Sequence, residues 1–218
     1  MTGIQSVILH APDPAAAEEF YATAFGLGDR LLVHAADAPT SGFRGYILSL
    51  VVAQPNIVDT LIDAATHGGA TTLKPAQKSF WGYGGVVQAP DGAIWKIASS
   101  AKKDSGPATR DIDDFVLLLG AADVRATKHF YLARGLSVAK SFGSKYVEFD
   151  TAGSPVKLAL YSRRAAAKDA GVAADGTGSH RIVIVGGSQP FTDPDGFTWQ
   201  ATTRTSTDHA VTVNRVSV

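Results

Sequence analysis

Apolar positions at the start of the chain follow first a strand pattern and then a helix pattern. The β-branched run from Ile4 to Ala11 predicts a buried strand. Residues 14–25 predict a helix, because their apolar residues recur at intervals of three and four. Asp13 stands where a residue caps such a helix, and Gly26 stands where one ends it. A further strand is expected at residues 31–34.

The next stretch predicts the order β-α-β-β-β. A continuous apolar run at 46–54 predicts a buried strand, and helical spacing over 55–67 predicts a helix that ends at paired glycines. Three strands are expected between residues 71 and 99, the last two joined by the turn Pro90-Asp91-Gly92. The polar segment 101–111 is expected to be a surface linker.

The same order returns after the linker. A strand is expected at 115–121, a helix from the cap residue Asp123 to about Arg134, and three strands within 137–162. Residues 163–170 predict a short helix with a solvated basic face. Two strands, 180–187 and 197–203, flank a second Pro-Asp-Gly turn.

Two pairs of similar segments indicate a tandem duplication. Residues 11–27 resemble residues 121–136, and residues 89–98 resemble residues 193–202. Tyr21 therefore aligns with Tyr131. The expected division is a first domain at 1–100, a linker at 101–111, a second domain at 112–203 and a weakly ordered tail at 204–218.

Composition narrows the partners and the chemistry. The 20 basic and 20 acidic residues balance, which argues against a nucleic-acid or membrane partner. Cysteine is absent, which excludes disulfides, thiolate catalysis and thiolate metal ligands. The N-terminal apolar run breaks at Pro12, too early for a secretory signal, so a cytoplasmic protein is expected.

Four elements recur in the same order in both halves: a strand ending in an apolar-x-Asp pattern, a helix carrying Phe-Tyr, a Gly-Leu exit and a Pro-Asp-Gly hairpin. Together they resemble the vicinal oxygen chelate superfamily of glyoxalases, bleomycin resistance proteins and extradiol dioxygenases. The resemblance implies an α+β fold of two tandem glyoxalase-like domains, built from βαβββ modules whose curled mixed sheets carry helices on the outer face. Residues 4–45 and 179–202 are too short for whole modules. Either each half has a shallow cleft, or the two halves complete each other.

The resemblance also implies positions for a divalent metal, which the family holds with a first-strand His, a Gln or His at the second module and a closing-strand Glu. Aligned on Asp13 and the Asp-Gly turns, these positions fall on or near Ser6, Val116, Ile47, His180, Lys96 and Gln200. Only His180 is a plausible ligand. A Lys96 ammonium about 4 Å from a dication would oppose binding by roughly 8 kcal/mol. No metal cofactor is therefore predicted; the alternative is Zn, Ni, Mn or Fe at a relocated site such as His10, His34 and Glu148.

Strand periodicity separates the expected cleft from the expected core. If Lys96 takes the place of the family's ligand, Ile94 and Ala98 face the cleft with it, while Trp95 and Ile97 pack under a helix. Trp199 is likewise expected in the core. On the other strands, the residues expected to point into a cleft are Ser6, Ile8, His10, Thr198 and Gln200.

Two groups of side chains carry the candidate chemistry. His10 beside Lys96 could bind a carboxylate or act as acid and base, although a simple structural histidine is the competing interpretation. The run 78–85 places three aromatic rings between glycines, where they could stack on a flat ligand or fill a domain interface. The predicted ligand-binding residues are Ser6, His10, Phe80, Trp81, Tyr83, Lys96, His180 and Gln200.

Three functions remain open at this point. The first is a metal-independent protein that binds or sequesters small aromatic or anionic compounds, by resemblance to the drug-sequestering branch. The second is a metal-dependent enzyme of the glyoxalase lyase or dioxygenase type. The third is an interaction module whose clefts are filled by the partner half, with no ligand at all. A homodimer is compatible with each.

Overall fold

A computed structural model describes residues 3–151 and 153–202. The tail predicted at 204–218 lies outside these residues. The strands are β1 (Ile4–Ala11), β2 (Leu31–Ala35), β3 (Thr40–Gly42), β4 (Tyr46–Val51), β5 (Thr71–Ser79), β6 (Gly82–Gln88), β7 (Ile94–Ser99), β8 (Asp114–Ala121), β9 (Ser137–Phe142), β10 (Tyr146–Asp150), β11 (Lys157–Ser162), β12 (Gly176–Gly178), β13 (Ile182–Gly186), β14 (Phe191–Thr192) and β15 (Thr198–Gln200). The α-helices are α1 (Pro14–Ala24), α2 (Pro55–His67), α3 (Val124–Ala133) and α4 (Arg163–Ala170).

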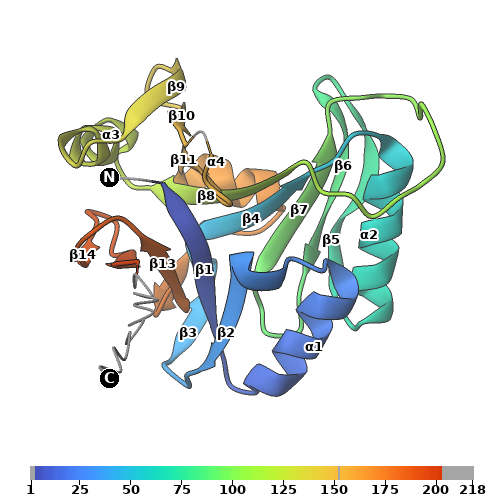
Figure 1. The fold of residues 1–218 in the computed structure, drawn as a ribbon, viewed down its shortest axis with the longest axis horizontal. Coiled ribbons are helices and arrows are strands. Elements are labelled where there is room, and N and C mark those ends of the chain that lie inside the picture. The colour runs from blue at the N-terminus through green and yellow to red at the C-terminus, as the bar shows by residue number, and fades with distance from the viewer. Residues whose placement is uncertain (1–2, 152, 203–218) are drawn as a thin grey trace, which may run out of the picture.

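The two sequence halves share both large sheets. The eight-stranded sheet has the order β5-β6-β7-β4-β8-β11-β10-β9, so the modules at 46–99 and 114–162 meet where β4 pairs antiparallel with β8 (Figure 1). The five-stranded sheet has the order β14-β15-β13-β1-β2, and β1 pairs antiparallel with β13. Of the two arrangements expected from the short modules, the structure therefore has the one in which the halves complete each other. The predicted domain boundaries themselves stay a prediction.

The outer helices begin where the sequence predicts. Asp13 accepts a hydrogen bond from the Ala16 amide at 3.1 Å, and Asp123 accepts one from the Arg125 amide at 2.9 Å. Such caps satisfy amides that have no partner within the helix. Helix α2 contacts β6 and β7, while α3 contacts β10 and β11. These helices cover the outer face of the eight-stranded sheet, as expected.

The main hydrophobic core lies beneath those helices. Trp95 and Trp199 are fully buried, which confirms their predicted place in the core. Ile97 also belongs to this core, whereas Ile94 belongs to a second hydrophobic cluster. The alternation predicted along β7 is therefore confirmed, with Lys96 on the face opposite Trp95.

Helix α4 departs from the predicted arrangement. It packs on β4, β7, β8 and β11, against the face that α2 and α3 leave free (Figure 1). Ala166, Ala167 and Ala170 are buried there. The sequence suggested a solvated basic helix, because its alanine stripe is too small to stand out as an apolar face. Among the helices described, none combines the length and apolar character needed to cross a membrane.

Candidate functional site

The candidate site is built on the inner face of the eight-stranded sheet. Ser49 in β4 pairs with Lys96 in β7 on one side and with Val116 in β8 on the other. Paired residues on adjacent strands project from the same face of a sheet. Lys96, Ser49 and Val116 thus form one row of side chains across the inner face, and Lys96 is its charged member. Helix α4 lies over the neighbouring row, which holds Ile47 and Leu118.

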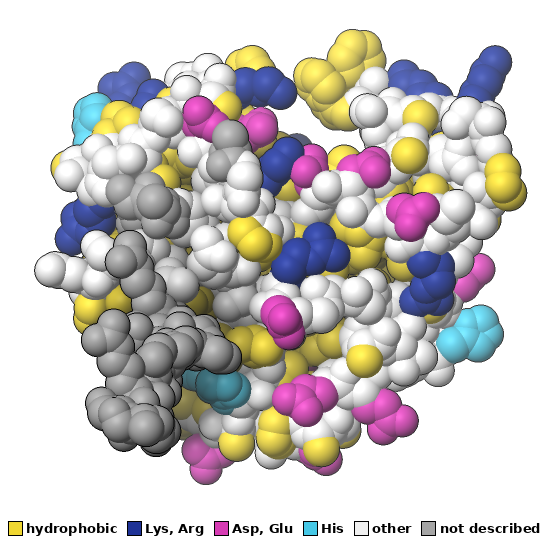
Figure 2. Space-filling model, viewed as in Figure 1, with side chains coloured by type: hydrophobic (Ala, Val, Ile, Leu, Met, Phe, Trp, Pro, Cys, Tyr) yellow, Lys and Arg dark blue, Asp and Glu magenta, His cyan; other side chains and the backbone are white. Residues whose placement is uncertain are grey.

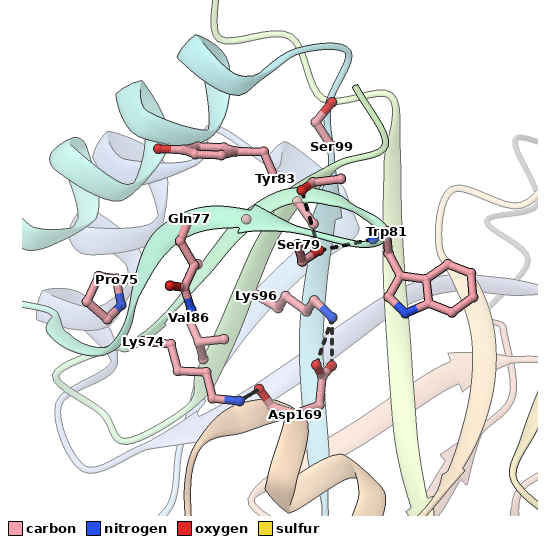
Figure 3. A pocket seen from close by; sticks show the side chains of 14 residues that line it. Lys74, Pro75, Gln77, Ser79, Trp81, Tyr83, Val86, Lys96, Ser99 and Asp169 are labelled. Atoms are coloured by element: carbon pink, nitrogen blue, oxygen red, sulfur yellow. Dashed lines mark hydrogen bonds and ion pairs between the residues drawn. The ribbon is translucent and has the colours of Figure 1, made fainter. Parts of the chain in front are cut away.

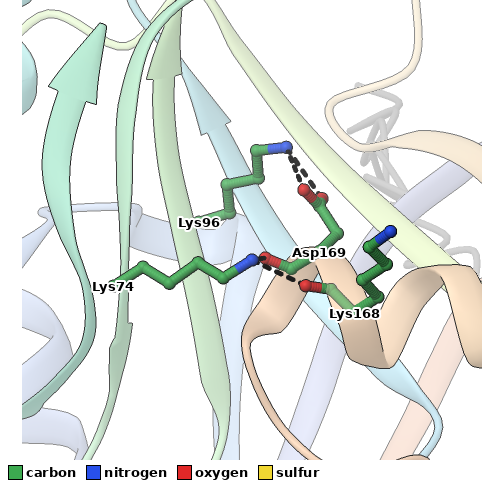
Figure 4. Close-up of polar contacts among 4 residues, drawn as sticks. All are labelled: Lys74, Lys96, Lys168 and Asp169. Carbon is green, nitrogen blue, oxygen red and sulfur yellow. Dashed lines mark hydrogen bonds and ion pairs between the residues drawn. The ribbon is translucent and has the colours of Figure 1, made fainter. Parts of the chain in front are cut away.

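The C-terminal end of α4 is held against this face by two lysines (Figure 4). The Lys96 ammonium contacts both carboxylate oxygens of Asp169, at 3.0 and 2.7 Å. The Lys74 ammonium donates to the carbonyl oxygens of Lys168 and Asp169 at 2.6 and 2.7 Å. A cation at these carbonyls opposes the partial negative charge of the helix C-terminus. Gly171 ends the helix at φ 80°, and Lys74 passes directly over it.

The N-terminal end of α4 is fixed independently of the two lysines. The Ser162 hydroxyl accepts a hydrogen bond from the Ala165 amide at 3.3 Å. The Arg163 guanidinium donates to the Phe43 carbonyl at 2.6 Å and to the Ala174 carbonyl at 3.0 Å. The C-terminal end of the helix is therefore tied to β5 and β7, the N-terminal end is tied to the segments around Phe43 and Ala174, and the alanines between them are buried.

A cavity of about 260 Å³ remains between α4 and the strands β5, β6 and β7 (Figure 3). In the space-filling view the upper edge of the molecule is notched beside the tip of the β5–β6 hairpin (Figure 2). Gly84 allows β6 and β7 to approach closely beside the cavity, because a Cβ at this position would lie 2.7 Å from the Ile97 carbonyl oxygen. The lining residues with polar or aromatic side chains are Lys74, Gln77, Ser79, Trp81, Tyr83, Lys96, Ser99 and Asp169.

The β5–β6 hairpin carries the aromatic residues predicted to border the cleft. Trp81 lines the cavity with 83% of its surface exposed, and Phe80 is 81% exposed and meets it edge to face at 5.0 Å. Tyr83 also lines the cavity, but its hydroxyl donates to Asp59 in α2 at 2.8 Å. This hydrogen bond, with partial burial, raises the pKa of Tyr83 to about 12. Trp81 is consequently the ring that is free to stack on a ligand.

The remaining predicted site residues lie elsewhere. Ser6 and Gln200 belong to β1 and β15 in the five-stranded sheet, where Ser6 is buried and Gln200 is exposed. His180 contacts the Arg44 carbonyl oxygen through Nδ1 and the Asp195 carbonyl oxygen through Nε2, and its ring stacks on Phe197. Both of its ring nitrogens are thereby occupied by backbone contacts.

His10 belongs to the five-stranded sheet and Lys96 to the eight-stranded sheet, and Lys96 pairs with Asp169 rather than with His10. His10 pairs across parallel strands with His34, and the two rings stack with centroids 6.4 Å apart. Burial, followed by the charges of His34 and Arg181, lowers the pKa of His10 below its usual value. Glu148, the third member of the alternative metal site, is in the eight-stranded sheet and contacts Tyr146 and Lys140 instead.

The metal implied by the resemblance does not fit the side chains present. Such a site needs imidazoles and carboxylates at short, fixed distances. Among residues 3–151 and 153–202, no group of three or more His, Asp and Glu side chains is arranged to hold a metal ion. None of the strand residues described at the centre of the inner face has a carboxylate or an imidazole; they are Ile47, Ser49, Lys96, Val116, Leu118 and Ala159. The carboxylates next to them, Glu148 beside Ala159 and Asp169 from α4, are paired with Lys140 and Lys96.

Trp81, Tyr83 and Lys96, which the sequence predicts as binding residues, line the cavity. Five further polar residues line it without being predicted, namely Lys74, Gln77, Ser79, Ser99 and Asp169. Asp169 was part of a segment interpreted as a solvated helix, and Lys74 is in a strand with no distinguishing motif. The signal in the sequence was the spacing of Ala166, Ala167 and Ala170, which gives α4 one small apolar stripe. Recognising that stripe would have placed Asp169 next to a sheet, though not next to Lys96.

Comparison with known proteins supports the architecture. No protein-family model matches the sequence, and a search of curated proteins finds no significant match. Among solved structures, glyoxalase I from Zea mays matches with a TM-score of 0.58 at 13% identity, covering 91% of each chain. A protein assigned as a candidate dioxygenase from Bacillus subtilis matches with a TM-score of 0.60 at 12% identity, covering 92% of this chain and 84% of the other. With its paired βαβββ modules, the chain therefore has the fold of the vicinal oxygen chelate superfamily.

Proposed function

We propose that the protein binds a small, flat, partly apolar compound in the cavity between β5, β6, β7 and α4, without a metal ion. The observation that carries this proposal is the combination of an open cavity, an exposed Trp81 ring at its rim and the Lys96 ammonium at its base. Small-molecule sites in proteins typically combine a concave, mostly apolar surface with a few fixed polar groups.

The chemistry of the lining indicates what the ligand is. An aromatic ring that stacks on Trp81 gains about 0.5–1.5 kcal/mol beyond the burial of apolar surface. The serine hydroxyls of Ser79 and Ser99 and the amide of Gln77 supply neutral hydrogen-bonding groups. The lining holds two lysines and one aspartate, so its balance of charge favours an anionic ligand over a cationic one.

Tryptophan fluorescence tests the proposal directly. The sequence has three tryptophans, and because Trp95 and Trp199 are fully buried, Trp81 is the one that solvent and ligand reach. We expect aromatic anions such as naphthoate to quench the emission saturably, in the presence of a chelator as well as in its absence. The Trp81→Ala variant should lose the response. Phe142→Ala is the matched control, since Phe142 is 66% exposed on another hairpin and should leave the response intact.

The metal-dependent enzyme makes the opposite prediction. Near-stoichiometric zinc, nickel, manganese or iron in protein purified without added metal would overturn metal-independent binding. A chelator-sensitive fluorescence response would do the same.

A second candidate function rests on α4. This helix occupies the centre of the inner face, which favours an interaction module whose cleft is filled by protein. The fluorescence titration separates the two proposals. Saturable quenching that depends on Trp81 supports the ligand-binding protein, whereas no response to any member of a broad aromatic library supports the interaction module.

A further inference from the structure

Asp169 has an unusual position for an acidic side chain. It lies in the last turn of α4, where a negative charge is unfavourable beside the partial negative charge of the helix C-terminus. It also lines the cavity, and both of its carboxylate oxygens contact the Lys96 ammonium. The side chains of Lys96 and Asp169 remain 32% and 28% exposed, so this ion pair is reached by water and by ligands. Helix stability alone does not account for an aspartate here.

The carboxylate can leave Lys96 without any movement of the helix. Lys74 holds the C-terminal carbonyls of α4, Arg163 holds its N-terminal end, and the alanine stripe is buried against the sheet. Among the described residues, the carboxylate of Asp169 is bonded to Lys96 alone, so turning this side chain toward water breaks no other hydrogen bond or ion pair. Within the part of the chain that the structure describes, Lys96 forms no other ion pair.

We propose that Asp169 acts as an internal stand-in for the ligand's anionic group, and that the natural ligand is an aromatic carboxylate whose own carboxylate displaces Asp169 from Lys96. This inference rests on the proposed function and specifies its ligand class. In the free protein Asp169 neutralises Lys96 at the base of the cavity. In the complex the ring lies against Trp81, the ligand carboxylate takes the place at Lys96, and Asp169 faces water.

The displacement of Asp169 from Lys96 affects the affinity for the carboxylate ligand, and this effect can be measured. A neutral amide of the same shape gains the stacking on Trp81 but cannot replace Asp169. The carboxylate has to compete with Asp169, so removing that competitor should tighten carboxylate binding. For a solvent-reached ion pair the expected gain is about fivefold. The gain should shrink at high salt, because the charges are screened.

The experiment is isothermal titration of the full chain with naphthoate and with its neutral amide, naphthamide. Asp169→Asn should bind naphthoate about fivefold more tightly than the wild type, with naphthamide affinity unchanged. Asp114→Asn is the matched control, since Asp114 pairs with Lys157 at 2.7 Å at a similar exposure on the same sheet. It should change neither affinity. Lys96→Met should abolish the preference for naphthoate over naphthamide while leaving naphthamide binding intact.

The possible failures are distinguishable. If both compounds bind through Trp81 but Asp169→Asn leaves naphthoate affinity unchanged, the stand-in role is wrong and the binding protein survives. Equal tightening of naphthoate and naphthamide would also overturn the stand-in role, because it would show a general opening of the cavity. If neither compound binds any variant and Trp81 does not respond, the proposed function and this inference both fail.

Discussion

Tyr131→Phe should destabilise the protein strongly, although it removes a single oxygen atom. The Tyr131 hydroxyl donates to Asp193 Oδ2 at 2.7 Å and accepts from Trp199 Nε1 at 3.1 Å. All three residues are buried. The other oxygen of Asp193 accepts from the amides of Asp195 and Phe197, both at 2.9 Å. Tyr131 thus joins α3 to the second Pro-Asp-Gly turn and to β15.

The magnitude follows from the groups that lose their partners. Phenylalanine at position 131 leaves one carboxylate oxygen of Asp193 without a donor and the Trp199 indole without an acceptor. A buried polar group left unpaired costs about 1–3 kcal/mol, and hydrogen bonds to charged groups lie at the upper end. We therefore expect a loss of about 2–4 kcal/mol in the free energy of unfolding. Burial already raises the pKa of Asp193, and losing the Tyr131 donor should raise it further.

The sequence repeat supplies a matched control. Tyr21 aligns with Tyr131 and is also buried, but the matching Asp91 and Trp95 side chains contact its hydroxyl too loosely to form a hydrogen bond of ordinary geometry. Tyr21→Phe should therefore change the free energy of unfolding by less than about 1 kcal/mol. Urea unfolding followed by circular dichroism measures both variants. Equal losses in the two variants, or a loss below about 1 kcal/mol for Tyr131→Phe, would contradict a stabilising role for the Tyr131 hydrogen bonds.

Three further predictions concern single side chains. Asp59→Asn should lower the pKa of Tyr83 from about 12 toward its ordinary value of 10.0, as read from phenolate absorbance. The stability that the hydrogen bond from Tyr83 to Asp59 contributes is present below pH 10 and is lost as pH rises through about 12. An unchanged Tyr83 titration would contradict the assignment. His34→Ala should raise the pKa of His10 toward 6.5 in an NMR titration, and because the pKa of His10 is lowered in the folded state, its burial costs stability as pH falls below 6.5. A further fall in the pKa of His10 would contradict the assigned effect of His34. Gly171→Ala should cost about 1 kcal/mol in thermal unfolding, since φ is 80° there, and no cost would argue against this helix end.

The sequence predicted what is local. Helix starts at Asp13 and Asp123, the alternation of Trp95 and Lys96, and the burial of Trp199 follow from capping and strand periodicity, and the structure confirms them. These features depend on neighbours within a few residues, so one sequence is enough to predict them.

The site was less predictable because it is non-local. Lys96 and Asp169 are 73 residues apart, and nothing in either segment indicates that they meet. Likewise, the antiparallel pairing of β4 with β8 and of β1 with β13 decides which halves share a sheet. His10 and Lys96, which the sequence predicts side by side, belong to different sheets. The alanine stripe of α4 is a weak apolar signal beside its arginines and lysine, so its burial was missed.

The most direct test of metal-independent binding is a crystal structure of chelator-treated protein grown with naphthoate. We expect the naphthalene ring to lie against Trp81, the ligand carboxylate to lie beside the Lys96 ammonium, and Asp169 to be turned toward water. Two results would contradict metal-independent binding in this cavity. One is naphthoate bound elsewhere while the cavity is empty, and the other is a transition-metal ion held on the inner face of the eight-stranded sheet.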